Sequence, residues 1–187
     1  MLNANQQFEF LTECFRTANE RLLFRVKHRD LWLKFQLIAQ FTLILLVMLG
    51  KIAYPDQTSL LQYLLILAFP IAALSCTLYV AQDRLIGHII EYLNSVARTV
   101  ADYGDQTVPI YNLESSPAGK DYTKTALPIR LIGQLFSFLM IPLWMLAYRL
   151  FNLHSFELIH MIMTGVDLIL AGLIVWLLST TYSSRRK

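Results

Sequence analysis

Residues 33–53 read LKFQLIAQFTLILLVMLGKIA, and this stretch decides the fold class of the chain. A helix of about 20 apolar residues is long enough to cross a bilayer. Three further apolar runs reach this length, at residues 60–80, 127–150 and 156–178. Backbone groups in lipid must be hydrogen-bonded within their own segment, so each run is expected to be a helix. The sequence therefore predicts an all-α, polytopic membrane protein with four transmembrane helices.

The composition agrees with this assignment. Of the 187 residues, 56% are hydrophobic and only 16% are charged, whereas a soluble domain usually carries about 25% charged residues. The net charge of +3 is small, and no basic stripe of the kind that binds nucleic acid is present. Cys14 and Cys76 lack the spacing of a zinc site. We expect no cofactor and no direct contact with nucleic acid.

The positions of the basic residues predict the orientation, because cytoplasmic segments are enriched in lysine and arginine. Fourteen of the sixteen lie in segments on one side of the four spans, and only Lys51 and Arg149 remain for the other side. Both chain ends and the segment between the second and third spans are therefore expected in the cytoplasm. The outer connections, 54–59 and 152–155, are short turns, and Arg149 is expected to be an ordinary interfacial anchor.

This orientation divides the chain into five parts. We expect an amphipathic cytoplasmic helix at 1–32, a transmembrane hairpin at 33–81, a cytoplasmic helix and linker at 82–126, a second transmembrane hairpin at 127–179 and a basic tail at 180–187. Pro70 and Pro142 fall within spans and are expected to kink them.

Two apolar stripes at helical spacing lie in the cytoplasmic parts. The first comprises Phe8, Leu11, Phe15, Ala18, Leu22 and Val26, and the second comprises Leu85, Ile89, Leu93, Val96, Val100 and Tyr103. No proline or glycine cluster separates the second stripe from the second span, so the two can form one long helix. The stripes either pack on each other, lie flat on the headgroups or dock a partner helix. The predicted partner-binding face comprises Phe8, Leu11, Phe15, Leu22, Arg84, Ile89, Tyr92 and Leu93.

Asp167 lies near the middle of the fourth span, where an ionised carboxylate costs about 2.5–3.5 kcal/mol on insertion scales. The predicted intramembrane polar site comprises Asp167, Thr164, His160, Glu157, Ser137 and Gln134. Antiparallel pairing of the last two spans makes Ser137 and Gln134 the expected hydrogen-bond partners of Asp167. Two interpretations stay open: a hydrated track or switch for protons or cations, and polar contacts that join helices.

The remaining sequence motifs are weaker evidence for a metal site, an interface or an enzyme. His154, Glu157 and His160 have residue types that suit zinc or copper, but their spacing wraps around the helix, so interfacial polar residues are the expected reading and no metal is predicted. Gly165 and Gly172 indicate close packing on another face, between protomers of a homo-oligomer. The chain carries no HExxH, GxSxG or P-loop motif, and we expect no enzymatic activity.

Residues 83–93 read DRLIGHIIEYL. They resemble the D-R-x-I-x-x-I-x-x-Y-I segment that follows the second span in small bacterial membrane proteins with four helices and an amphipathic N-terminus. Those proteins often have a Trp-Glu pair in the next linker, where this chain has Leu113 and Glu114. The layout is also similar to membrane subunits of anti-phage systems, such as the four-helix Kiwa subunit and two-helix SLATT-type effectors.

The resemblance implies a bacterial inner-membrane subunit that senses or perturbs the membrane together with a cytosolic partner, in anti-phage defence. We expect such a subunit, embedded in the lipid bilayer and assembled as a homo-oligomer. The alternative is a small ion channel or proton-coupled transporter that uses Asp167.

Overall fold

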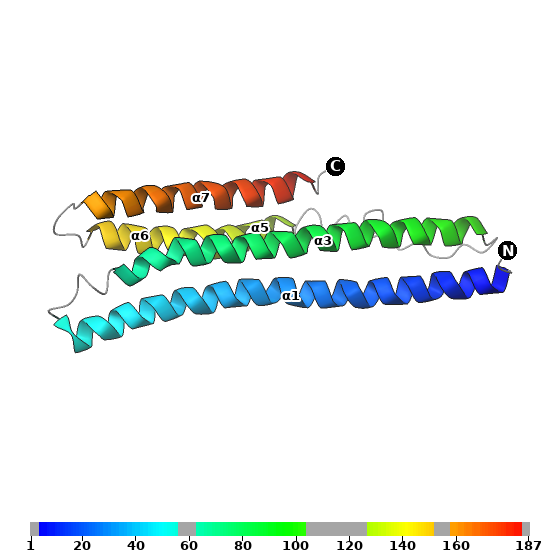
Figure 1. The fold of residues 1–187 in the computed structure, drawn as a ribbon, viewed down its shortest axis with the longest axis horizontal. Coiled ribbons are helices and arrows are strands. Elements are labelled where there is room, and N and C mark those ends of the chain that lie inside the picture. The colour runs from blue at the N-terminus through cyan, green and yellow to red at the C-terminus, as the bar shows by residue number, and fades with distance from the viewer. Residues whose placement is uncertain (1–3, 56–62, 104–126, 152–157, 185–187) are drawn as a thin grey trace. The chain divides into compact units, whose positions relative to one another are not determined.

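The computed structural model describes residues 4–55, 63–103, 127–151 and 158–184, and all of their regular structure is helical. The long helices are α1 (Ala4–Ala53), α3 (Ala68–Tyr103) and α7 (Leu158–Ser184). A short 3-10 helix, η2 (Leu64–Leu67), precedes α3. The third apolar run forms α5 (Leu127–Leu135), a π-helical turn η4 (Phe136–Met140) and α6 (Ile141–Phe151). Figure 1 shows the path of the chain.

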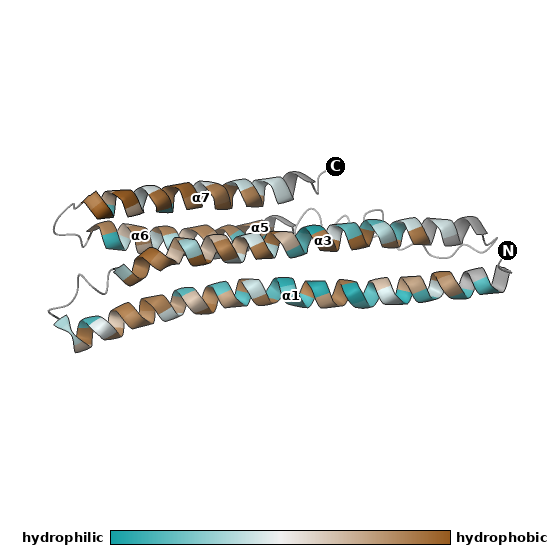
Figure 2. Cartoon of the chain, viewed as in Figure 1, coloured by the Kyte–Doolittle hydropathy of each residue, from teal (hydrophilic) through white to brown (hydrophobic). Residues whose placement is uncertain are grey.

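Four of these helical stretches are long and apolar enough to cross a membrane, as the sequence predicts. They are Glu9–Ala53, Leu64–Val96, Ile129–Phe151 and Leu158–Thr181. Figure 2 shows hydrophobic residues along most of α6 and α7, whereas hydrophilic residues are frequent in the first part of α1 and the last part of α3. The two longest helices therefore each contain a polar and an apolar portion.

The chain forms two compact units, which we describe separately. The polar hairpin comprises residues 1–29 and 81–130, and the apolar bundle comprises residues 30–80 and 131–187. The first expected boundary, between an amphipathic helix and a separate span, lies inside a helix, because α1 runs unbroken for 50 residues. The second stripe likewise continues from the second span in the 36 residues of α3.

In the polar hairpin, α1 and α3 pack through their apolar stripes. Ala18 of the first stripe and Val96 of the second are buried, together with Ile86. Because the two helices cover each other along these positions, the hairpin has a small core of its own. Phe15 of the first stripe and Leu85 of the second are 44% and 41% exposed, so the three arrangements considered for the stripes stay open.

The core of the apolar bundle draws on α1, α3, α6, α7 and η4. Its main cluster includes Phe69, Cys76, Phe138, Leu146 and Ile174, and Trp32 and Leu33 pack against it. A second cluster contains Leu43, Val47, Leu65, Ala68 and Met145. Large apolar side chains also cover the outside of the bundle: Ile169 is 72% exposed and Trp176 is 58% exposed.

The two prolines of the spans act differently. Pro70 is the third residue of α3 and directly follows the change from the 3-10 helix η2 to α3, near the start of the second apolar run. Pro142 directly follows the π-helical turn, in which the N–H of Ile141 donates to the carbonyl of Phe136, five residues back. The third apolar run therefore contains a wider turn rather than one regular helix.

Candidate functional site

A buried ion pair joins α6 and α7 in the apolar bundle. Arg149 Nη2 lies 2.8 Å from Asp167 Oδ2 and 3.2 Å from Thr164 Oγ1. Arg149 is 1% exposed and Asp167 is 2% exposed. Burying either charge without its partner would cost several kcal/mol, because an ion loses its hydration in a protein interior. Asp167 is therefore neutralised by a guanidinium from the neighbouring helix.

Two sequence predictions are wrong here. Arg149 is not an interfacial anchor, and Asp167 does not take Ser137 or Gln134 as its partner. Side chains on a helix lean toward its N-terminus. Because α6 and α7 are antiparallel, Arg149 leans away from the connecting segment and Asp167 leans toward it. The Cα atoms of Arg149 and Asp167 lie at different levels along the two helices, and the long arginine side chain spans this difference.

Ser137 and Gln134 make other contacts. Gln134 Nε2 donates a 2.7 Å hydrogen bond to the hydroxyl of Tyr79 in α3. The Ser137 hydroxyl donates to the carbonyl of Gly133 in its own helix, at 2.8 Å. The predicted polar site thus separates into two groups, one at Arg149 and Asp167 and one that joins α3 to the third apolar run.

His160 and Thr164 belong to the first group. The Thr164 hydroxyl donates to the carbonyl of His160 at 2.8 Å. The His160 ring stacks on Tyr63 with 5.2 Å between ring centroids, and its Nε2 lies 3.4 Å from the Tyr63 hydroxyl. A polar series therefore runs along α7 from Asp167 to His160. Glu157 and His154 lie outside the described residues, and within the described part no cluster of three metal-ligating side chains occurs.

Two buried glutamines of α1 were missed by the sequence analysis. Gln36 and Gln40 are fully buried. Gln40 Nε2 donates to the carbonyl of Ala68, where α3 begins, at 2.8 Å. Gln36 Nε2 donates to the carbonyl of Ser137 at 3.3 Å. Their spacing could have predicted a shared polar face, because two amides four residues apart within an apolar run lie on the same side of a helix.

The Gln36 contact has a specific cause. In the π-helical turn the N–H of Ile141 donates to Phe136 and not to Ser137. The next residue, Pro142, has no N–H. The Ser137 carbonyl therefore lacks the donor that its own helix would supply, and the amide of Gln36 takes that place. An unmade hydrogen bond of a buried carbonyl costs about 1–3 kcal/mol.

One end of the polar hairpin is held by a buried carboxylate. Asp83 Oδ1 accepts from Arg130 Nη2 at 2.8 Å and from Arg29 Nη1 at 3.3 Å. One turn before Arg29, Arg25 Nη1 donates to the side chain of Gln82 at 3.3 Å. Asp83 is 3% exposed. It thereby joins α1, α3 and α5, and it is the first residue of the DRLIGHIIEYL stretch.

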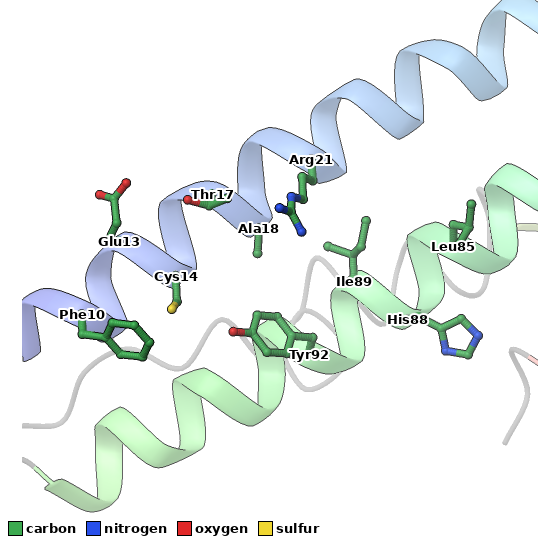
Figure 3. A pocket seen from close by; sticks show the side chains of 10 residues that line it. All are labelled: Phe10, Glu13, Cys14, Thr17, Ala18, Arg21, Leu85, His88, Ile89 and Tyr92. Atoms are coloured by element: carbon green, nitrogen blue, oxygen red, sulfur yellow. The ribbon is translucent and has the colours of Figure 1, made fainter. Parts of the chain in front are cut away.

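An open groove runs between α1 and α3 within the polar hairpin (Figure 3). Its volume is about 490 Å³. The lining residues are Phe10, Glu13, Cys14, Thr17, Ala18, Arg21, Leu85, His88, Ile89 and Tyr92. Phe10 is 63% exposed and Tyr92 is 48% exposed, so large aromatic surfaces remain uncovered at its edges. Cys14 of α1 and Tyr92 of α3 both line it.

The groove contains part of the predicted partner-binding face. Ile89 and Tyr92 line it, and Phe15 is exposed outside it. Leu11, Leu22 and Leu93 are half-buried, and Arg84 is exposed. The side chain of Phe8 lies outside the described residues. Sequence periodicity did not identify Phe10, because it lies beside the first stripe rather than on it.

Comparison with models of protein families, with curated proteins and with solved structures found no match to this chain.

Proposed function

We propose that this chain is a non-enzymatic subunit of a bacterial inner membrane that works together with a cytosolic protein. In this proposal the four apolar helices cross the bilayer, and both termini and the polar hairpin lie in the cytoplasm. The four helices of sufficient length and hydropathy support the first part. The placement of fourteen of sixteen basic residues supports the second.

The observation that carries the proposal is the groove of the polar hairpin. Two helices alone cannot surround their apolar stripes, and a third amphipathic helix is a common way to cover such a surface. The exposed aromatic side chains of Phe10 and Tyr92 provide large contact areas at low entropic cost. We propose that a helix of the cytosolic partner lies in this groove.

The role of the complex in this proposal is to sense or perturb the membrane, as the similarity in layout to anti-phage subunits implies. Assembly of several copies would bring several grooves together on one face of the membrane. The glycines of α7 are compatible with contacts between copies, because a Cβ added at Gly165 or Gly172 would meet nothing within 4 Å in one chain. Small residues of this kind permit close approach of helices in lipid.

The alternative is a channel or proton-coupled transporter that uses Asp167. The buried polar series from Asp167 to His160 favours it, since such series mark ion pathways in membrane proteins. The pairing with Arg149 argues against it, because a guanidinium held against the carboxylate competes with any cation for that site. Flux from liposomes tests this alternative: a leak that Asp167→Asn abolishes would favour transport.

Co-purification tests the main proposal. The full chain is expressed with its genomic neighbours and extracted in mild detergent, and retained cytosolic protein is quantified. We expect the wild type to retain a specific protein and Phe10→Glu to lose it, because a charge then faces the apolar partner. The matched control is Leu23→Glu, since Leu23 is 57% exposed on the same helix but does not line the groove.

Two results would contradict the proposal. One is a wild-type chain that retains no cytosolic protein in its own genetic context. The other is retention that Phe10→Glu leaves unchanged while both variants unfold at the temperature of the wild type.

A further inference from the structure

We propose that the apolar bundle binds a monovalent metal cation at a set of buried oxygen atoms contributed by α1, α3 and η4. The ligands are the amide oxygens of Gln36 and Gln40, the hydroxyl of Ser75 and the carbonyl of Ser137. All four residues belong to the apolar bundle. The inference is independent of the groove in the polar hairpin, and it requires neither a protein partner nor transport.

Three side-chain oxygens of this set are buried without a hydrogen-bond partner among the described residues. They are Gln36 Oε1, Gln40 Oε1 and Ser75 Oγ. Each of these three residues is 0% exposed, so solvent at the surface does not reach them. A buried polar atom without a partner is costly, and native proteins contain few of them. Three such atoms in one bundle indicate a ligand that the chain itself does not supply.

The nitrogens of the two amides fix where their oxygens lie. Gln40 Nε2 donates to the carbonyl of Ala68, and Gln36 Nε2 donates to the carbonyl of Ser137. The opposite orientation of either amide would place two acceptors against each other, so both oxygens are left to accept from elsewhere. A carbonyl oxygen has two lone pairs, and the Ser137 carbonyl can therefore contact a cation beside the Gln36 oxygen.

Ser75 lies on the face of α3 that meets these glutamines. Ala68, Ala72 and Ser75 follow each other at steps of four and three residues, which is one face of a helix. Along the helix axes, Gln36 lies about 6 Å from Gln40, and Ser75 lies about 10 Å from Ala68, the residue that Gln40 contacts. The two helices are antiparallel and side chains lean toward the N-terminus of their own helix, so Gln36 and Ser75 lean toward each other.

The chemistry of the set suits a monovalent metal cation. All four groups present oxygen, the ligand that hard cations prefer, and none is a carboxylate, which calcium and magnesium sites normally contain. Carbonyl oxygens replace the hydration shell of potassium in channels, and carbonyls of interrupted helices coordinate sodium in transporters. The π-helical turn provides such a carbonyl, because Ser137 receives no N–H from Ile141 or from Pro142.

Thermal unfolding of the full chain tests the inference, with sodium as the probe. Protein in a neutral detergent is heated in sodium chloride or in choline chloride at equal concentration, and tryptophan fluorescence records the melting temperature. We expect sodium to raise the melting temperature in a saturable way, because a ligand that binds only the folded state stabilises it. At a concentration about a hundredfold above the dissociation constant, the increase should be about 5–10 °C.

Ser75→Ala is the decisive variant, because it removes one ligand but no hydrogen bond that the Ser75 hydroxyl makes within the described part of the chain. In choline chloride it should unfold no lower than the wild type. In sodium chloride it should need a concentration about tenfold higher or more for half of the effect, the loss expected for one contact with a charged group. Gln36→Leu removes a second ligand and should lose the sodium dependence as well.

Thr77→Val is the matched control. The Thr77 hydroxyl belongs to the same helix, but it already donates to the carbonyl of Ala73 at 2.8 Å. This variant should respond to sodium as the wild type does.

Two outcomes would overturn the inference. One is an equal melting temperature of the wild type in sodium chloride and in choline chloride at every concentration, which would leave water as the partner of these oxygens. The other is a sodium response of Ser75→Ala that matches the wild type. Neither outcome bears on the cytosolic partner, which co-purification tests separately.

Discussion

Replacing Asp167 by asparagine should destabilise the apolar bundle strongly, because it leaves the charge of Arg149 buried without a counter-charge. The two side chains are 1% and 3% exposed, so water cannot solvate the unpaired charge. Arg149 Nε and Nη1 have no hydrogen-bond partner among the described residues, which makes Asp167 its principal acceptor. Removal of one partner from such a pair costs about 3–5 kcal/mol. For a chain of this length, each kcal/mol lowers the melting temperature by about 2–4 °C.

The expected decrease in melting temperature is therefore about 6–20 °C for Asp167→Asn. Arg149→Met should cost less, because the remaining carboxylate can take up a proton, whereas a guanidinium stays charged. The double variant Arg149→Met/Asp167→Leu should unfold close to the wild type, since apolar side chains can replace a buried pair.

Tryptophan fluorescence during heating in detergent measures these melting temperatures, and Trp144 and Trp176 report on α6 and α7. The control pair is Glu13 and Arg16, which is exposed, so its single and double replacements should leave the melting temperature unchanged. The reasoning fails if Asp167→Asn unfolds at the temperature of the wild type, or if the double variant is less stable than both single variants.

Two further predictions concern the other polar contacts. Gln36→Leu should lower the stability by about 1–3 kcal/mol, because the Ser137 carbonyl loses its donor. Pro142→Ala restores a backbone N–H, so the double variant Gln36→Leu/Pro142→Ala should recover part of this loss in thermal unfolding; an identical cost of Gln36→Leu in both backgrounds would contradict the argument. Asp83→Asn should cost about 2 kcal/mol and accelerate hydrogen exchange at the start of the second stripe, since two arginines lose a charged acceptor. Glu91→Gln, on an exposed side chain of the same helix, is its control, and equal exchange in both variants would contradict this role.

Local sequence predicted the helices well, because a continuous apolar run of about 20 residues has few structural alternatives. Residues 33–53 lie in α1, residues 64–80 in η2 and α3, residues 127–150 in α5, η4 and α6, and residues 158–178 in α7. The interior of the third run was less predictable. A proline predicts an irregularity in a helix, but Pro142 by itself does not predict the π-helical turn before it. That turn also depends on the amide of Gln36, which comes from another helix.

The buried polar site of the apolar bundle was predicted in part. Asp167, Thr164 and His160 form a connected polar series along α7, as their spacing of three and four residues indicates. The partner Arg149 was not predicted, because its place near the end of a span is also typical of interfacial anchors. Gln36 and Gln40 were not predicted, because amides within an apolar run do not reveal which helix they face.

What the sequence determined by itself is the class of the molecule: four apolar helices, two amphipathic stripes and a strong asymmetry of basic residues, all properties of short segments. What only the tertiary structure decided is which polar groups meet. Arg149 reaches Asp167 because antiparallel neighbours lean their side chains toward each other, and Gln36 reaches Ser137 because a proline removes a backbone donor there. Such pairings depend on the rotation and height of helices distant in sequence, and helical periodicity carries no information about either.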